Sequence, residues 1–130
     1  MSTYSRSTVA PKRRSLIGCS ILIVEDEPLV ALDLHAALSA AGAGIIAATE
    51  AREALRLISR NEISAAVIDI KLGNRDSLEV CQALFHRRVP FLFHTGHADA
   101  ALVKAWPEIP LLVKPAWPHV VVACVADLVN

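Results

Sequence analysis

Short apolar runs alternate with amphipathic segments along most of the chain. The apolar runs cover residues 21–24, 45–48, 65–68, 90–94 and 111–113. Continuous apolar runs of this length are typical of strands that are buried on both faces of a parallel sheet. We therefore predict five strands, each followed by a loop and a helix.

Helical patterns fill the spaces between the runs, over residues 28–41, 53–60, 77–88, 98–105 and 118–128. Strands that alternate with helices indicate a doubly wound parallel sheet, an α/β fold with helices on both faces. The fourth helix should be short, because Pro107 and Pro110 leave little chain to form it. In the first helix, we expect Leu29, Leu32 and Ala36 to share the face that packs on the sheet.

Composition narrows the class of protein. The 130 residues fit one domain, and equal numbers of basic and acidic residues give no electrostatic reason to expect nucleic-acid or membrane binding. No apolar run approaches the length of a membrane span, and three cysteines without a Cys-x-x-Cys spacing are typical of free thiols in the cytoplasm. Residues 1–18, which are basic and free of acidic side chains, are predicted to form a flexible tail before a domain over 19–130.

Polar side chains directly follow four of the five runs or end them. Glu25 and Asp26 follow the first run, Asp69 the third, Thr95 the fourth and Lys114 the fifth. In the doubly wound order 2-1-3-4-5 the first and third strands are neighbours, so the three carboxylates should converge at the carboxyl edge of the sheet. Such a cluster favours a hard cation such as Mg²⁺. Lysine and threonine could then bind a phosphoryl group, with Asp69 as the nucleophile that forms an acyl phosphate.

Four segments that carry these residues read ILIVEDEP, AAVIDIKLGNRDSLEV, FLFHTGHAD and LLVKPAWP, in this order. Together they resemble the receiver domain of two-component response regulators, in the CheY-like superfamily, and the likeness spans residues 20–128. The resemblance implies a flavodoxin-like (βα)5 fold whose strand order is 2-1-3-4-5.

The resemblance also implies a role for each residue at the strand ends. Asp69 would accept a phosphoryl group from the phosphohistidine of a sensor histidine kinase or phosphotransfer protein. Asp26, Asp69 and the backbone carbonyl of Lys71 would hold Mg²⁺, and Glu25 would act through metal-bound water. Thr95 would move to contact the phosphoryl oxygens, with Lys114 paired to them.

The sequence departs from the receiver pattern at two positions. Receivers usually carry Tyr or Phe three residues before the lysine, where this chain has Leu111, so a switch driven by an aromatic rotamer is not expected. The Phe-x-Thr-Gly motif and the short segment before Lys114 are similar to a stand-alone receiver subgroup of alphaproteobacteria. In that subgroup Ala is common where this chain has His94.

Two hypotheses remain for the function. The first is a single-domain response regulator that catalyses only its own phosphorylation and dephosphorylation, and acts through a partner because no DNA-binding segment follows Asn130. The second is a receiver-like module that binds partners without being phosphorylated. An aspartyl phosphatase would need a second Asp where Lys71 stands. Lys71 and His97 overlook the phosphoryl site and either affect the loss of the phosphoryl group or face solvent.

The last helix offers a surface for a homodimer or another partner. Its valines lie on nearly every side of the helix, at Val120, Val121, Val122 and Val125. Core packing accounts for about half of such positions, and the others would face outward.

Overall fold

A parallel five-stranded sheet forms the centre of the computed structural model, which describes residues 15–73 and 75–130. Its strands lie in the order β2 (Gly44–Ala48), β1 (Ser20–Val24), β3 (Ala65–Ile68), β6 (Phe91–Thr95) and β7 (Leu111–Val113). This is the predicted order 2-1-3-4-5, because β4 (Lys71–Leu72) and β5 (Arg75–Asp76) pair with each other outside the sheet. Residues 1–14, most of the predicted tail, lie outside the described residues.

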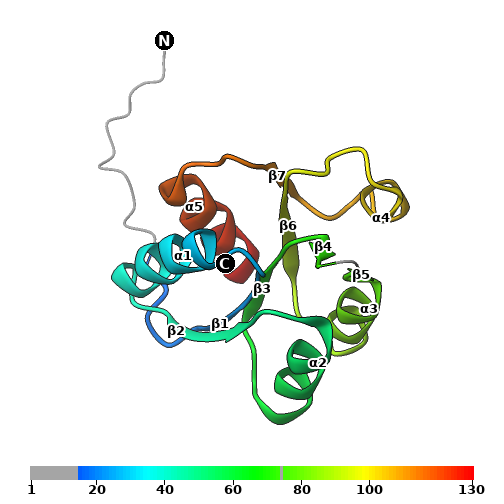
Figure 1. Ribbon diagram of the computed structural model, residues 1–130. Coiled ribbons are helices and arrows are strands. Elements are labelled where there is room, and N and C mark those ends of the chain that lie inside the picture. The colour runs from blue at the N-terminus through cyan, green and yellow to red at the C-terminus, as the bar shows by residue number, and fades with distance from the viewer. Residues whose placement is uncertain (1–14, 74) are drawn as a thin grey trace.

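Helices cover both faces of the sheet. Figure 1 shows α1 (Pro28–Ala40) and α5 (Pro118–Val129) on one face, and α2 (Ala51–Arg60) and α3 (Leu78–His86) on the other. The remaining helix, α4 (Ala101–Ala105), has five residues, as short as the sequence predicted. The arrangement is the doubly wound, flavodoxin-like fold.

The sheet separates two hydrophobic cores, and β6 contributes to both of them. Phe91 and Phe93 pack into the core under α2, α3 and α4, whereas Leu92 packs into the core under α1 and α5. Successive strand residues point to opposite faces, so the next residue, His94, lies on the same face as Leu92. The position of His94 therefore depends on α1 and α5.

The face of α1 that packs on the sheet differs from the predicted one. Leu29 and Leu32 are 77% and 64% exposed, and the buried leucines are Leu34 and Leu38. Leucines occupy several sides of this helix, so apolar periodicity does not define a single face. The pair at i and i+4 is buried because it packs together with α5 in one core.

Residues 15–18, which we call the N-terminal strap, were assigned to the tail in the sequence analysis, but they include a core residue. Leu16 is fully buried in the core under α1 and α5, and its N–H donates to the carbonyl of Ala41 at 2.8 Å. Gly42 has a φ of +102°, and a Cβ added there would lie 2.5 Å from Cγ1 of Ile17. Glycine is therefore required where the N-terminal strap crosses the end of α1.

The three cysteines are free thiols. Cys81 lies in the core under α3, where burial raises its pKa to about 12. Among residues 15–73 and 75–130, no helix has the length and apolar character needed to cross a membrane.

Candidate functional site

Polar side chains from three strand ends meet at the carboxyl edge of the sheet, as the sequence predicted. Lys114 follows β7, and its Nζ lies 2.9 Å from Oε1 of Glu25 and 2.9 Å from Oδ2 of Asp69. Both carboxylates are almost fully buried, with 2% and 5% exposure. The lysine therefore supplies the positive charge that permits two carboxylates to be buried side by side.

Glu27 also belongs to this cluster, although the sequence reasoning did not select it. Its Oε1 contacts the ammonium of Lys114, and oxygens of Glu25, Glu27 and Asp69 all lie within 4.8 Å of one another. Glu27 is the N-cap residue of α1 and does not immediately follow a strand, which is why the strand-end pattern missed it. The unbroken run Glu25-Asp26-Glu27 is the signal that could have revealed it.

The oxygens of this cluster suit a hard cation. Oδ1 of Asp69 is buried and accepts no hydrogen bond from the described residues. Oε1 of Glu25 has its ion pair with Lys114 but no well-directed hydrogen bond. Buried carboxylate oxygens that lack donors are the ligands Mg²⁺ prefers in proteins.

The sequence predicted that Asp26 would join this cluster, but its carboxylate is not among the three whose oxygens lie within 4.8 Å of one another. Its Oδ2 accepts a hydrogen bond of 2.7 Å from the N–H of Gly73, at the tip of the β4–β5 ribbon. Lys71 begins the same ribbon, opposite Asp76, with its side chain exposed. The hydrogen bond from Gly73 therefore connects Asp26 to the segment that follows Asp69.

Burial and charge shift two ionisable groups of the site in the same direction. Burial raises the pKa of Glu25 from 4.5 to about 7, because the contact with the Lys114 ammonium and the hydrogen bond from the Glu27 N–H only partly offset the desolvation of its carboxylate. Burial alone would lower the pKa of Lys114, but its contacts with the carboxylates of Glu25, Glu27 and Asp69 outweigh this effect and raise it. The ammonium thus stays charged, and Glu25 exchanges a proton near neutral pH.

Thr95 is fully buried at the end of β6, next to Lys114. Its Oγ1 accepts a hydrogen bond of 3.1 Å from the N–H of His97, and its carbonyl accepts one of 2.8 Å from the N–H of Lys114. The Lys114–Pro115 peptide bond is cis. Leu111 pairs with Phe93 in the sheet and is only half-buried.

Ser77 is a second residue that the sequence reasoning did not select. Its buried Oγ donates to the carbonyl of Asp69 and lies 3.1 Å from the carbonyl of Ile70. These contacts join the start of α3 to the loop after β3, which fixes the backbone from which the Asp69 side chain projects.

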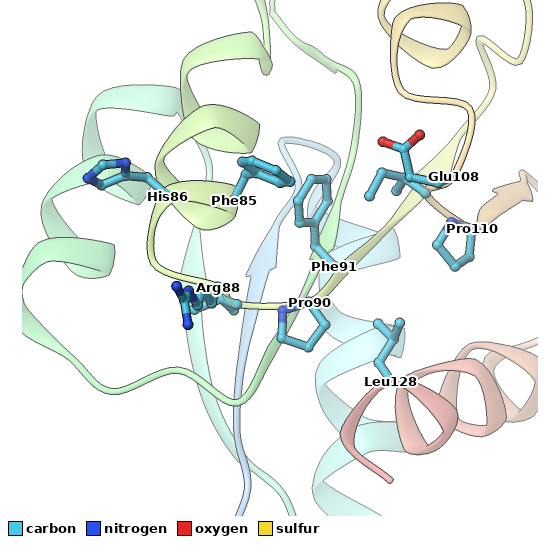
Figure 2. A pocket seen from close by; sticks show the side chains of 10 residues that line it. Phe85, His86, Arg88, Pro90, Phe91, Glu108, Pro110 and Leu128 are labelled. Atoms are coloured by element: carbon cyan, nitrogen blue, oxygen red, sulfur yellow. The ribbon is translucent and has the colours of Figure 1, made fainter.

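A large hollow lies away from this cluster. It has a volume of about 700 Å³ and includes Phe85 of α3, Phe91 of β6 and Leu128 of α5 (Figure 2). Pro90 and Phe91 stand at the start of β6, so this hollow is at the opposite edge of the sheet from Asp69.

Comparisons with known proteins agree with this geometry. The sequence model described as the response regulator receiver domain matches residues 21–109. The chain belongs to this family. This match confirms the resemblance seen in the sequence. Receiver domains are phosphoacceptor modules of two-component response regulators and typically bind Mg²⁺.

Several known proteins are similar to this chain in sequence or in structure. The chain is 33% identical over 116 residues to the phyllosphere-induced regulator PhyR of Methylorubrum extorquens, in an alignment that covers 85% of this chain and 43% of that protein. A structure of the anti-anti-sigma factor PhyR from Bartonella quintana is 26% identical, with a TM-score of 0.77, over 90% of this chain and 50% of that one. A receiver protein from Sinorhizobium medicae is 28% identical, with a TM-score of 0.77, over 89% and 98%. The receiver spans less than half the length of the curated relatives it matches.

Proposed function

We propose that this receiver accepts a phosphoryl group on Asp69 from the phosphohistidine of a sensor histidine kinase or a phosphotransfer protein. An oxygen of Asp69 attacks phosphorus, a P–O bond forms, and the P–N bond breaks as the imidazole leaves. The observation that carries the proposal is the buried carboxylate of Asp69, with Lys114 on Oδ2 and no hydrogen bond to Oδ1 from the described residues. Oδ1 is thus available as a Mg²⁺ ligand, and Oδ2 becomes the attacking oxygen when Lys114 moves to the phosphoryl group.

The surrounding residues have distinct roles in this proposal. Lys114 leaves the carboxylates with which it now pairs and binds a phosphoryl oxygen, while the hydroxyl of Thr95 turns toward another. Ser77 holds the backbone of Asp69 in place. The same groups would govern hydrolysis of the acyl phosphate, in which water attacks phosphorus and returns the carboxylate.

Glu25, Asp26, Asp69 and the carbonyl of Lys71 would hold Mg²⁺, with Glu27 remaining a partner of Lys114. Mg²⁺, when bound, supplies positive charge that offsets the negative charge of the transferring phosphoryl group. Asp26 is preferred over Glu27 because its hydrogen bond to Gly73 holds it beside the loop that carries Asp69 and Lys71. Glu27 contacts the ammonium instead.

Intact-mass measurement after incubation with Mg²⁺ and acetyl phosphate tests the phosphoacceptor. We expect one added phosphoryl group that is lost when Mg²⁺ is withheld and in Asp69→Asn, and retained in the matched control Asp99→Asn. If acetyl phosphate gives no adduct, candidate histidine kinases replace it as donors. Absence of labelling by every donor would favour the unphosphorylated binding module.

Two further variants test the metal ligands. Asp26→Asn should weaken Mg²⁺ binding at least tenfold, as expected for the loss of a charged ligand, whereas Glu27→Gln should bind Mg²⁺ nearly as the wild type does. If Glu27→Gln weakens Mg²⁺ binding and Asp26→Asn does not, Glu27 rather than Asp26 is the metal ligand.

We also propose α1 as the surface that docks the kinase. Leu29 and Leu32 are exposed on this helix, which begins beside the carboxylate cluster. Leu32→Ser should slow phosphorylation by a kinase and leave labelling by acetyl phosphate unchanged, because the small donor needs no docking surface. Equal slowing with both donors would contradict this assignment.

A further inference from the structure

A second hollow, of about 360 Å³, lies beside the proposed phosphorylation site. It is bounded by the first part of α1, the end of β6 and the segment that joins β7 to α5. The lining residues are Glu27, Val30, Asp33, Leu34, His94, Lys114, Pro115, Ala116 and Pro118. We call it the His94 pocket.

His94 gives this pocket an unsatisfied polar wall. Its side chain is only 3% exposed, and neither Nδ1 nor Nε2 has a hydrogen-bond partner within residues 15–73 and 75–130. Burial and the charge of Lys114 lower the pKa of His94, so the ring is neutral near pH 7 and retains one acceptor nitrogen. Buried polar groups of folded proteins are almost always hydrogen-bonded, so an unpaired imidazole that lines a cavity indicates a missing partner.

The charge of the pocket favours a cationic ligand. Glu27 and Asp33 each contribute a carboxylate, and the ammonium of Lys114 is already in contact with three carboxylates. Negative charge is therefore in excess even where Lys114 lines the wall. An anion would meet these carboxylates, whereas a cation would be attracted to them.

The remaining walls are apolar and fit a short hydrocarbon chain. Val30 and Leu34 come from α1, and they face Pro115 and Ala116 from the segment before α5 and Pro118 at its first position. A volume near 360 Å³ is at the lower end of the range for ligand sites, about 300–1,000 Å³. The pocket thus combines space for a few carbon atoms with one buried acceptor and a negatively charged wall.

We propose that the His94 pocket binds a compact organic cation, a guanidinium or primary ammonium group on a short alkyl chain, that donates a hydrogen bond to His94. The carboxylates of Glu27 and Asp33 balance its charge, and its alkyl chain packs on Val30 and Leu34. Such a group belongs to a free small molecule or to a basic side chain of another protein. This inference goes beyond the proposed function and requires neither Mg²⁺ nor phosphorylation.

An NMR titration of the full chain with n-butylguanidinium, without Mg²⁺ or a phosphodonor, tests the proposal. We expect a dissociation constant on the order of 1 mM, as is usual for ligands of so few atoms, with shifts at the Val30 and Leu34 methyl groups. Neutral n-butylurea has nearly the same shape and should bind at least tenfold more weakly. Equal binding of the two compounds, or no shift at these methyl groups, overturns the proposal.

Variants of the pocket test which groups are responsible. Asp33 is exposed on α1, so Asp33→Asn should fold normally and should lower the affinity for butylguanidinium several-fold. Asp99 lies outside the pocket, so Asp99→Asn should leave this affinity unchanged. His94→Ala should weaken it about tenfold, the effect of losing one hydrogen bond to a buried group. Unchanged affinity in folded Asp33→Asn or His94→Ala refutes the proposed contacts.

Two comparisons complete the design. If capped arginine amide binds as tightly as butylguanidinium, the site is assigned to a side chain of another protein. If it binds much more weakly, the site is assigned to a free small molecule. If neither compound binds, the proposal is overturned. Asp69→Asn should still bind butylguanidinium, within a few-fold of the wild type, because Asp69 does not line the pocket and only its charge beside Lys114 is lost. Because that variant cannot be phosphorylated, failure of the proposed function and failure of the pocket are separate results.

Discussion

Replacing Lys114 by methionine tests the electrostatic arrangement of the receiver most directly. The ammonium of Lys114 lies 2.9 Å from carboxylate oxygens of both Glu25 and Asp69, which are almost fully buried. Methionine has a similar length and no charge. The variant thus leaves two carboxylates close together without a cation.

Removing one partner of a buried ion pair typically costs about 3–5 kcal/mol. Two features of this site reduce the loss. Glu27 is 59% exposed and can turn to solvent, and the Glu25 pKa of about 7 allows that group to become neutral by taking up a proton. We expect a loss of about 3 kcal/mol at pH 8 and roughly half of that at pH 5, where protonation of the carboxylates requires less free energy.

Thermal unfolding followed by circular dichroism measures the difference. A loss of about 3 kcal/mol corresponds to a Tm decrease of roughly 10 °C in a chain of this size, and Mg²⁺ should restore part of it by replacing the missing charge. Lys104→Met, on the exposed side of α4, is the matched control and should change Tm little. The reasoning is refuted if Lys114→Met loses no more stability at pH 8 than at pH 5, or no more than the control.

Four further results are expected. Calorimetry should show Mg²⁺ affinity rising with pH up to about 7, because Glu25 must lose its proton, and Glu25→Gln should abolish the rise. The same proton stabilises the metal-free fold, an increment present below pH 4.5 and lost as pH rises through about 7. By urea unfolding, Leu16→Ala should cost about 2–4 kcal/mol and the exposed Ile17→Ala under about 0.5. Gly42→Ala should cost at least about 1 kcal/mol, since its φ is positive and its Cβ would meet Ile17, whereas Gly96→Ala has open space.

Opposite results would each contradict a specific observation. A Mg²⁺ affinity that does not change between pH 5 and pH 8 would show that Glu25 is not a metal ligand or that its pKa is not raised. Equal losses from Leu16→Ala and Ile17→Ala would show that the strap does not pack on the domain. If Gly42→Ala matches Gly96→Ala, the strap moves aside without cost.

The sequence predicts the strands well because each is a short apolar run, and three of them, β1, β3 and β6, are buried on both faces. The run over residues 65–68, for example, coincides with β3. It fails for the packed face of α1, where Leu29 and Leu32 compete with Leu34 and Leu38 and only contact with α5 decides between them. Periodicity within one helix carries no information about its neighbour.

The candidate site divides in the same way. The convergence of Asp69 and Lys114 follows from strand order, so the positions of the apolar runs were sufficient to predict it. The contact of Glu27 with Lys114 and the hydrogen bond from Gly73 to Asp26 join segments far apart in the sequence, and they depend on side-chain rotamers and on the positive φ of Gly73. The β4–β5 ribbon was not predicted because its two-residue strands are too short to show alternation.

The brevity of α4 has a consequence for motion within the domain. A helix of five residues has little more than one turn, and an isolated turn is unstable in water. The segment is held by Leu102 in the core and by the ring of Trp106, which packs edge-on against Phe85 and Phe91. The ring centroids are 5.5 and 5.8 Å apart, respectively. Amide protons of α4 should therefore exchange with solvent through local opening, at a lower free energy than those of β1 or β3. The segment between β6 and β7 can thus rearrange while the sheet stays intact.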